Sequence, residues 1–471
     1  KGIINLESIK SIIYHNVSAQ KVQKKIKKII LTKPLHPTKI ILGTYAFLIL
    51  LGTILLSLPF AHQGSLSLTN ALFTATSATT VTGLIVVDTA KNFTIWGQLI
   101  ILSLIQLGGL GYILFGTFFL LGLKNITLKN RQLLQTAVNY PGFYGLTHFL
   151  KRILPIIFFI ELVGIVPLLL TFLNYKMPFS KALFHSVFHS VSAFNNAGFS
   201  SFSNNIIAFK HQFLFIFSMA ILIILGGIGF FVINELLLYS QKKIKKISIH
   251  TKITLSITGF LIVLGTLIIF FTEFSYQPNI PLATKLTDSA FISVTARTAG
   301  FNIVEISSLS SASLLFIINL MFIGASPGGT GGGIKTVTFA IAFFTLWAFL
   351  NKKEDVIVFK RKIAEKYLKK AFSIILLSIF CILLMTFILN IIEKIDFLPS
   401  LFEVTSAFAT VGLSTGNNAN LSLTATFSNL GKLTIIICML IGRIGILSFA
   451  IAFLRQEKNT YLKYPEERII I

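Results

Sequence analysis

The chain has 471 residues, of which 54% are hydrophobic and only 12% are charged. A soluble domain typically carries about 25% charged residues, so the composition excludes an ordinary soluble protein. Lys and Arg (41) greatly outnumber Asp and Glu (16). In a soluble protein this excess would suggest nucleic-acid binding, but in so apolar a chain we interpret it as a topology signal and expect no nucleic-acid partner.

Long apolar segments recur in pairs along the chain, and each approaches or exceeds the roughly 20 residues that span a bilayer. The first segment of each pair covers 40–59, 153–173, 253–271 or 371–392, and the second covers 96–121, 213–238, 313–350 or 433–454. The pattern predicts eight transmembrane helices.

Basic residues separate these pairs. Of the 41 Lys and Arg residues, 31 fall in the segments 1–39, 124–152, 242–252, 352–370 and 455–468. Short cytoplasmic loops collect Lys and Arg, so we predict that these segments are cytoplasmic and that both termini lie inside. The N-terminal segment shows no apolar core with a small-residue cleavage site, so we expect no cleavable signal peptide.

A short motif is repeated four times between the paired segments. Its glycines, Gly83, Gly198, Gly300 and Gly412, are 115, 102 and 112 residues apart. Each follows a polar run of helical length that is too short to span a membrane, at 70–80, 181–194, 288–296 and 398–409. We therefore predict a re-entrant half-helix and loop in each copy, all entering from the outside.

These repeats divide the chain into units. We predict a basic cytoplasmic segment (1–39), four pore units (40–123, 150–241, 250–350 and 371–454) and a cytoplasmic tail (455–471). Non-helical backbone at membrane depth is tolerated only where protein or a water-filled cavity surrounds it. The predicted fold is therefore an all-α polytopic membrane protein whose four tandem units are arranged pseudo-fourfold around a central pore, as in K+ channels.

The loops have the composition of a K+ filter. Such a filter replaces the hydration shell of the ion with backbone carbonyls, and glycine adopts the required backbone angles without steric cost. A ring of Asp or Glu would suggest Ca2+ and a ring of Arg or Lys an anion, and neither is present. The predicted filter residues are Thr80, Val81, Thr82, Gly83, Asn195, Asn196, Ala197, Gly198, Arg297, Thr298, Ala299, Gly300, Ala409, Thr410, Val411 and Gly412.

Two units depart from the repeat below the loops. The second apolar segment of the third unit is interrupted by Ala325, Ser326, Pro327, Gly328, Gly329, Thr330, Gly331, Gly332, Gly333, Ile334 and Lys335. This composition cannot form a stable helix, and it lacks the strand and GxxxxGK[ST] spacing of a phosphate-binding loop. In the fourth unit Arg443 replaces a small residue at mid-membrane depth, where an arginine usually faces a cavity. We predict that 325–335 and Arg443 form a gate; the alternative is that Arg443 only joins helices by binding a carbonyl or carboxylate.

The remaining reactive side chains indicate no enzyme. His185 and His189 are spaced to face one side of a helix, but no third metal ligand is evident, so packing is the stronger interpretation. Cys381 and Cys438 lie in apolar segments and suggest neither a disulfide framework nor a metal site. Paired catalytic carboxylates are missing, and we expect no organic cofactor.

The sequence resembles the ion-translocating subunits of the Ktr/Trk/HKT superfamily of potassium transporters over nearly its whole length. The marks of the resemblance are the segments 80–89, 194–199, 296–301, 326–336 and 442–445, with the tail 464–468. Eight predicted helices instead of ten favour a bacterial Ktr-type subunit.

The resemblance implies a K+ uptake protein that is activated by or coupled to Na+, forms a homodimer in the bacterial inner membrane and binds a cytoplasmic ring of regulatory subunits that senses ATP and ADP. It also implies that 325–335 is an intramembrane gate with Arg443 beside it. A Na+/K+ symporter with an alternating-access cycle is the alternative. Inverted repeats and midplane ionisable sites would favour that cycle, whereas the repeats here are parallel.

Overall fold

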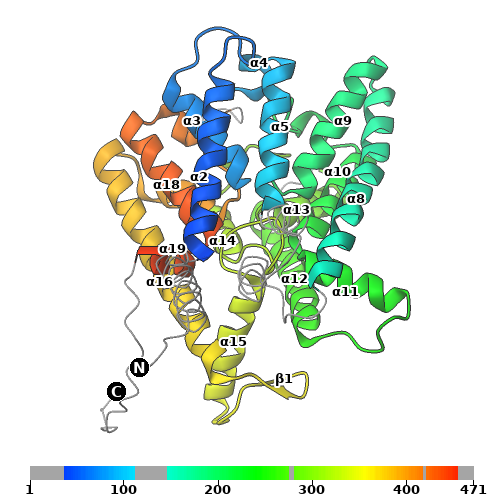
Figure 1. Cartoon of the computed structure of the whole chain (residues 1–471), viewed down its shortest axis with the longest axis vertical. Coiled ribbons are helices and arrows are strands. Elements are labelled where there is room, and N and C mark those ends of the chain that lie inside the picture. Colours follow the sequence, from blue (N-terminus) through cyan, green and yellow to red (C-terminus); the bar gives the residue numbers. More distant parts are fainter. Residues whose placement is uncertain (1–36, 112–145, 275–279, 417–420, 454–471) are drawn as a thin grey trace, which may run out of the picture.

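The computed structural model describes residues 37–111, 146–274, 280–416 and 421–453, and these form an almost entirely helical molecule (Figure 1). Four helices within these ranges are long and apolar enough to cross a membrane. They are α2 (Pro37–Leu56), α8 (Leu146–Asn174), α12 (Ile249–Ile269, extended by the π-helical turn η2, Phe270–Phe274) and α16 (Glu365–Glu393). Each corresponds to the first apolar segment of a predicted unit.

A short helix follows each long one and packs against it. These half-helices are α3 (Leu68–Thr80), α9 (Phe179–Phe194), α13 (Leu282–Thr295) and α17 (Phe397–Ala409). Each overlaps a predicted half-helix. Their C-terminal turns are buried inside the bundle although they are rich in Ser and Thr, so these hydroxyls must find partners within the protein.

The units contact one another in a closed cycle. The helix after each half-helix packs against the half-helix of the next unit: α5 (Ile95–Gly109) on α9, α10 (Phe213–Gly227) on α13, α14 (Ser311–Phe322) on α17, and α18 (Asn429–Ile444) on α3. The fourth unit thereby closes on the first. The predicted all-α membrane fold is confirmed, whereas the unit boundaries and the exact pseudo-fourfold geometry remain predictions.

The second helices differ from the uninterrupted spans that apolar length suggests. The chain bends by 100° between α10 and α11 (Phe230–Ser240), where Gly229 has φ of 98°. It breaks again between α18 and α19 (Ile446–Phe453) at Gly445, with φ of 88°. Between α14 and α15 (Thr336–Leu350) the break is the predicted glycine-rich segment. A positive φ is incompatible with a continuing right-handed helix.

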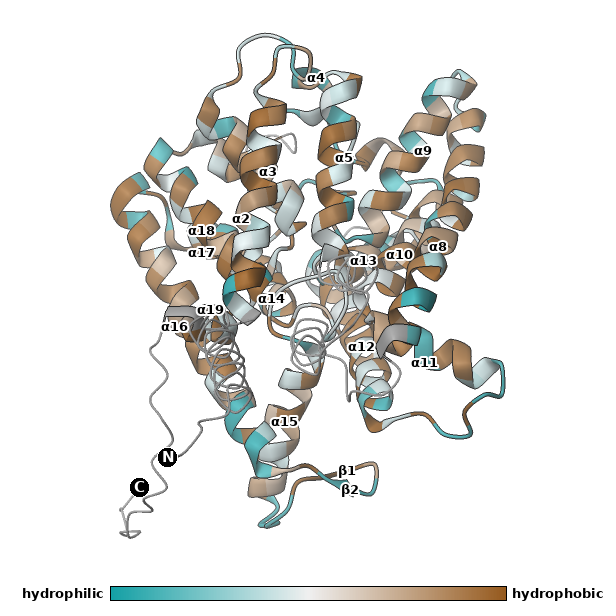
Figure 2. Cartoon of the chain, viewed as in Figure 1, coloured by the Kyte–Doolittle hydropathy of each residue, from teal (hydrophilic) through white to brown (hydrophobic). Residues whose placement is uncertain are grey.

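The outer faces of the long helices are apolar, as Figure 2 shows for α2, α8 and α16. On α16 the exposed side chains Leu376, Phe380, Leu383, Phe387 and Ile391 recur every three or four positions and therefore form one stripe. In water this surface would be an aggregation site. In a bilayer it is the surface expected against lipid.

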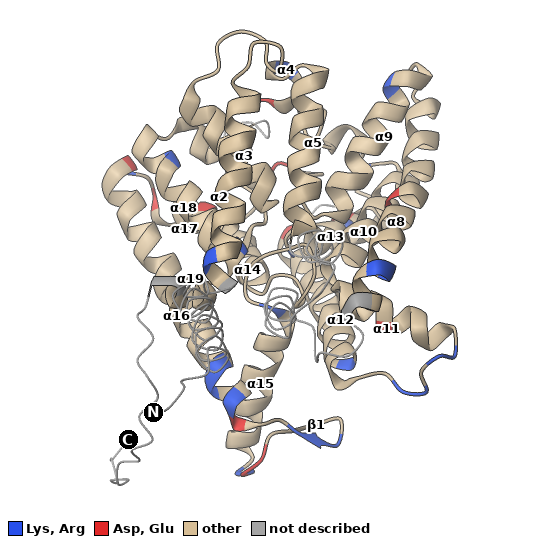
Figure 3. Cartoon of the chain, in the orientation of Figure 1, with Lys and Arg blue, Asp and Glu red and all other residues tan. Residues whose placement is uncertain are grey.

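Charged side chains gather at one end of the molecule (Figure 3). That end carries the connection from α11 to α12 and the hairpin of β1 (Ile357–Val358) and β2 (Arg361–Lys362). The opposite end carries α4 (Thr89–Asn92), and η1 (Ile207–Phe209), η3 (Ile306–Ser308) and η5 (Leu423–Thr426) lie between the loops and the helices that follow them. The prediction that both termini are cytoplasmic concerns the segments 1–36 and 454–471, which are outside the described residues.

Candidate functional site

Each half-helix ends in a loop with the same unusual backbone. The loop glycine and the residue two positions before it have positive φ, whereas the residue between them does not. The pairs are Val81 (57°) and Gly83 (89°), Asn196 (57°) and Gly198 (70°), Thr298 (76°) and Gly300 (74°), and Thr410 (51°) and Gly412 (94°). A side chain at positive φ costs free energy and persists only where the surroundings enforce it. Alternation of left- and right-handed residues turns successive carbonyls toward the same side.

The four loop glycines contact one another in a ring. A methyl group placed on any of them would lie close to the Cα atom of the glycine in the next loop. The distances are 3.1 Å from Gly83 to Gly198, 3.1 Å from Gly198 to Gly300, 3.1 Å from Gly300 to Gly412, and 3.0 Å from Gly412 back to Gly83. Each methyl group would also collide with the carbonyl oxygen of the residue before the next glycine. No side chain fits in this ring, and its lining is therefore backbone.

Buried hydroxyl groups on the half-helices hold the loops. Ser77 Oγ accepts a hydrogen bond of 3.1 Å from the Gly83 amide, and Ser406 Oγ accepts one of the same length from the Gly412 amide. In the third unit Thr295 Oγ1 accepts from the Phe301 amide at 2.8 Å. The sequence shows these residues only as polar positions in short helices, and the structure assigns them this supporting role.

The polar side chains that break the similarity of the loops point away from the ring. Arg297 is 8% exposed, and its Nη1 donates to the carbonyl of Thr258 on α12 at 3.3 Å. Asn195 donates to Gln106 Oε1 at 2.6 Å and to Glu161 Oε1 at 3.1 Å. The sequences of the loops therefore differ in the side chains behind the backbone, while the backbone itself is repeated.

This arrangement suits a cation. Carbonyl oxygens are hard ligands of the kind that replace water around a monovalent cation. The C-terminal ends of α3, α9, α13 and α17 adjoin the loops, and a helix C-terminus carries partial negative charge. The loop residues 80–83, 195–198, 297–300 and 409–412 contribute no carboxylate, so only neutral dipoles would balance the dehydration of an ion bound there.

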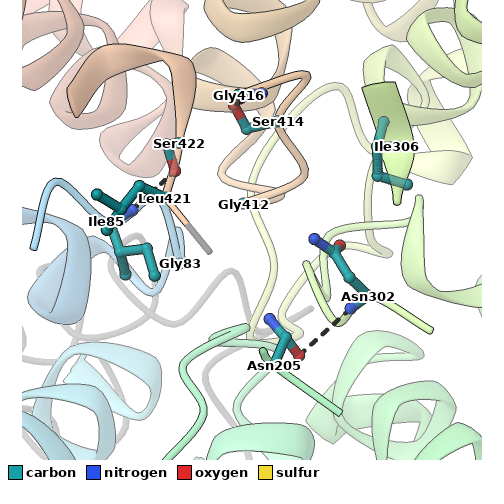
Figure 4. Close-up of a pocket in the computed structure, with 10 residues that line it drawn as sticks. All are labelled: Gly83, Ile85, Asn205, Asn302, Ile306, Gly412, Ser414, Gly416, Leu421 and Ser422. Carbon is teal, nitrogen blue, oxygen red and sulfur yellow. Dashed lines mark hydrogen bonds between the residues drawn. The ribbon is translucent and has the colours of Figure 1, made fainter. Parts of the chain in front are cut away.

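A small cavity lies on the outer side of the loops (Figure 4). It measures about 30 Å³, enough for about two water molecules. Gly83 and Gly412 line its inner side, and Asn205 and Asn302 from the second and third units line another wall, joined by a hydrogen bond of 3.3 Å from the Asn302 amide to Asn205 Oδ1. The outer face of the loops is therefore accessible and polar.

A buried carboxylate, which the sequence analysis did not single out, shapes this outer face. Glu403 on α17 is fully buried. It accepts hydrogen bonds from Ser414 Oγ at 2.5 Å, from Thr424 Oγ1 at 2.5 Å and from the Thr424 amide at 3.0 Å. These bonds join the segment after Gly412, which contains Ser414, to η5, which contains Thr424. The signal in the sequence was a lone acidic residue in a half-helix, which by itself indicates no partner.

The glycine-rich segment between α14 and α15 runs directly under the loops. The Gly332 amide donates to Thr410 Oγ1 at 2.9 Å, and a methyl group on Gly331 would collide with Thr298. On its other side, the Thr330 amide donates to the carbonyl of Gly226 at 3.1 Å. The segment thus contacts two loops and the helix of the second unit, and its lack of side chains permits this close approach.

Arg443 fastens this segment to the first unit. Its Nη1 donates to the carbonyl oxygen of Thr330, and its Nη2 donates to those of Gly108 at 2.6 Å and Gly109 at 3.2 Å. Its Nε donates to Tyr45 Oη at 3.1 Å. The guanidinium group therefore bridges α18, the glycine-rich segment, the end of α5 and α2, as the helix-joining alternative requires. The same contacts also hold the segment in place beneath the loops.

A cavity of about 470 Å³ opens below the segment. Arg443 and Lys335 line it together with Tyr45, His250 and Lys370, and none of its lining residues is acidic. Lys335 is turned back on its own segment, where Nζ donates to the carbonyl of Gly331 at 2.5 Å. The glycine-rich segment and the two basic groups Lys335 and Arg443 therefore form one wall of this cavity.

The two histidines are packed, as expected. His189 lies 3.0 Å from Ser200 Oγ through Nε2, and His185 lies 2.7 Å from Ser201 Oγ through Nδ1. Within the described ranges no group of three or more His, Cys, Asp or Glu residues could hold a metal ion. Cys381 and Cys438 are buried free thiols.

Comparison with known proteins identifies the family. The family described as TrkH, cation transport protein, matches residues 10–464. The chain belongs to this family. The family is one of membrane proteins of cation transport, and the match confirms the resemblance found in the sequence.

Relatives of the chain match it almost from end to end. It is 40% identical to the Ktr system potassium uptake protein D of Bacillus subtilis, over 94% of this chain and 98% of the relative. It is 38% identical to the Ktr system potassium uptake protein B of Vibrio alginolyticus, over 92% and 94%. It is 34% identical to the potassium/sodium uptake protein NtpJ of Enterococcus hirae, over 93% and 98%.

A solved structure shares the fold. The potassium transporter TrkH from Vibrio parahaemolyticus superposes with a TM-score of 0.70 over 90% of this chain and 86% of that one, at 17% sequence identity. At this identity the likeness supports the TrkH fold alone. The roles of individual residues in this chain rest on its own geometry.

Proposed function

We propose that this chain is the K+-translocating subunit of a bacterial K+ uptake system, and that K+ passes through a filter made by the four loops. The observation that carries the proposal is the closed ring of Gly83, Gly198, Gly300 and Gly412, in which any side chain would collide with the neighbouring loop. A lining of carbonyl oxygens without carboxylates favours a weakly hydrated monovalent cation over Ca2+. The names of two relatives, both potassium uptake proteins, support this choice of ion.

The proposed gate is the segment 325–335 together with Arg443. It lies between the loops and the inner cavity, and its contacts with Thr410 and Gly226 would block the path as long as they persist. A fixed positive charge in a cation path is a barrier by simple Coulomb repulsion. Opening requires that Thr330 leave Arg443, which a small displacement of the segment would accomplish.

The remaining parts of the proposal concern the assembly. The chain acts in the bacterial inner membrane as a homodimer, with both termini and the basic end in the cytoplasm. A cytoplasmic ring of regulatory subunits that binds ATP and ADP controls the gate. Na+ acts as an activator or co-ion, an idea that the name of the potassium/sodium uptake protein NtpJ supports. K+ and Na+ are substrate or effector ions, and no organic cofactor is required by this chain.

The alternative is a Na+/K+ symporter with an alternating-access cycle. Inverted repeats would favour it, whereas the four repeats of this sequence are predicted to be parallel, each with its loop entering from the outside. Uptake of K+ into liposomes down its own gradient, with Na+ absent on both sides, distinguishes the two. A strict requirement for Na+ in every turnover would favour the symporter.

Rescue of a bacterium that lacks its own K+ uptake tests the proposal. The chain is expressed with a cytoplasmic regulatory subunit of its family, and growth is measured at low external K+, with and without Na+. We expect the wild-type chain and Gly259→Ala to restore growth, because a methyl group at Gly259 meets no atom within 4 Å. Gly83→Asp and Gly412→Asp should abolish it. Growth that survives both Asp substitutions would overturn the filter assignment, and failure of the wild-type chain would overturn K+ uptake.

A further inference from the structure

A carboxylate is buried behind the second loop, on a helix that the proposed filter does not include. Glu161 lies in the middle of α8 and is 4% exposed. Two ion pairs lie in the described part of the chain, Lys362 with Asp355 and Lys369 with Glu365, and neither includes Glu161. A buried carboxylate without a basic partner is costly, so its retention at this position calls for a function.

The partners of Glu161 are two amide side chains from neighbouring units. Gln106 on α5 donates from Nε2 to both carboxylate oxygens at 3.1 Å. Asn195, the first predicted filter residue of the second unit, donates from Nδ2 to Glu161 Oε1 at 3.1 Å and to Gln106 Oε1 at 2.6 Å. The three side chains form a closed triangle that joins the first unit, the second unit and the second loop.

Asn195 transmits this triangle to the loop backbone. It is the residue that follows α9, and the next residue, Asn196, has the positive φ that begins the carbonyl run. Both asparagines are completely buried. Because the side chain of Asn195 is held from behind, the dihedral angles of the loop at this point depend on the geometry of the triangle.

We propose that Glu161 is a positioning residue for ion selectivity, which sets the second loop through its hydrogen bonds to Gln106 and Asn195. The proposal rests on the proposed K+ filter. Glu161 does not touch the ion and acts through Asn195.

The substitution Glu161→Gln tests this role while it preserves volume. One of the two donors then faces an amide NH2 group and loses its acceptor. We expect the KM for K+ to rise about tenfold and the preference for K+ over Na+ to fall by about the same factor, since a buried donor left without an acceptor costs about 1–3 kcal/mol. The maximal rate should change less. The KM, the maximal rate and the K+ preference are measured as K+ uptake kinetics, with Na+ or Rb+ as competitors, in the bacterium that lacks its own K+ uptake.

A swap of the two partners supplies the decisive comparison. In the double variant Glu161→Gln with Gln106→Glu, one carboxylate and two amides again occupy the triangle, and Asn195 keeps its acceptors. We expect this variant to recover most of the wild-type selectivity, which a role in folding alone would not produce.

Glu393→Gln is the matched control. This carboxylate also lies on the first helix of its unit, but it accepts a hydrogen bond of 3.0 Å from the Ser428 amide at the start of α18 instead of one from a filter-loop residue.

The outcomes separate the inference from the proposed function. If wild type rescues growth and Glu161→Gln has the KM and selectivity of Glu393→Gln, the inference is wrong and the filter stands. A swap variant no more selective than Glu161→Gln also overturns it. If Glu161→Gln does not accumulate in the membrane, Gln106→Ala replaces it as the test. This variant keeps the carboxylate but removes the 2.6 Å bond from Asn195 to Gln106, so it must reduce selectivity. Wild-type selectivity of Gln106→Ala overturns the positioning role. Failure of the wild-type chain itself contradicts the proposed function instead.

Discussion

Arg443 and Gly108 are joined by a hydrogen bond of 2.6 Å although 335 positions separate them in the chain. The bond connects α18, which carries Arg443, to the C-terminal end of α5. It closes the cycle of units on the inner side of the loops. Arg443 also holds the Thr330 carbonyl, so a single side chain fixes both the cycle and the glycine-rich segment beneath the ring.

Arg443→Ala should therefore release the glycine-rich segment. Removal of a hydrogen bond to a charged group costs about 1.5–3 kcal/mol, and 1.4 kcal/mol corresponds to a tenfold change in an equilibrium. We expect K+ flux into liposomes to rise about tenfold. Lys362→Ala, at the exposed hairpin, serves as the control. Unchanged flux with normal amounts of protein in the membrane would leave Arg443 with the helix-joining role alone.

Tyr45→Phe should have a smaller effect of the same sign. The Tyr45 hydroxyl accepts from Arg443 Nε at 3.1 Å and donates to the Gly108 carbonyl at 3.1 Å, so its loss weakens but does not remove the bridge. Because Arg443 keeps its bonds to Thr330, Gly108 and Gly109, we expect only part of the cost of a bond to a charged group to appear, and a rise in flux of about two- to fivefold. In the double variant with Arg443→Ala the effects should not add, because both act on one network. Additive effects would show that Tyr45 acts elsewhere.

Gly412→Ala should abolish selective K+ uptake even though it adds only a methyl group. That methyl group would lie 3.0 Å from the Cα of Gly83 and would collide with the Thr82 carbonyl, at a residue with φ of 94°. We expect K+ uptake to fall by about 100-fold or more, in line with the strain and displacement of a carbonyl ring. Gly43→Ala, where nothing lies within 4 Å, should retain wild-type uptake. Selective uptake by Gly412→Ala would contradict the close ring of glycines.

The two helix breaks predict an order of stability. Gly229 has φ of 98° and a methyl group there would lie 2.6 Å from the Pro327 carbonyl, whereas Gly445 has φ of 88° and open space. Gly445→Ala should cost about 1 kcal/mol from backbone conformation alone, and Gly229→Ala about 1–3 kcal/mol more from the collision. Thermal unfolding in detergent should give midpoints that fall in the order wild type, Gly445→Ala, Gly229→Ala. Equal midpoints for the two variants would show that the contact with Pro327 is relieved without cost.

The sequence alone predicted the repeated elements and the positions of the loops. Apolar length, polar half-helices such as 398–409 and glycines such as Gly412 are local properties, and a local property can be recognised without knowledge of the fold. The same holds for the break at 325–335, because five glycines and a proline within so short a segment exclude a helix in any environment.

The tertiary structure alone decided which small residues break a helix and which polar residues act together. Gly226 and Gly229 stand three positions apart in one apolar run, yet Gly226 continues the helix and permits close packing on α9, whereas Gly229 turns the chain. The turn occurs where Gly229 contacts the Pro327 carbonyl and the Phe230 amide donates to the Gly328 carbonyl, both in another unit. Glu161, Gln106 and Asn195 come from three separate elements. A lone carboxylate in an apolar segment indicates no partner, because its partners are determined by which helices pack together and not by its neighbours in the chain.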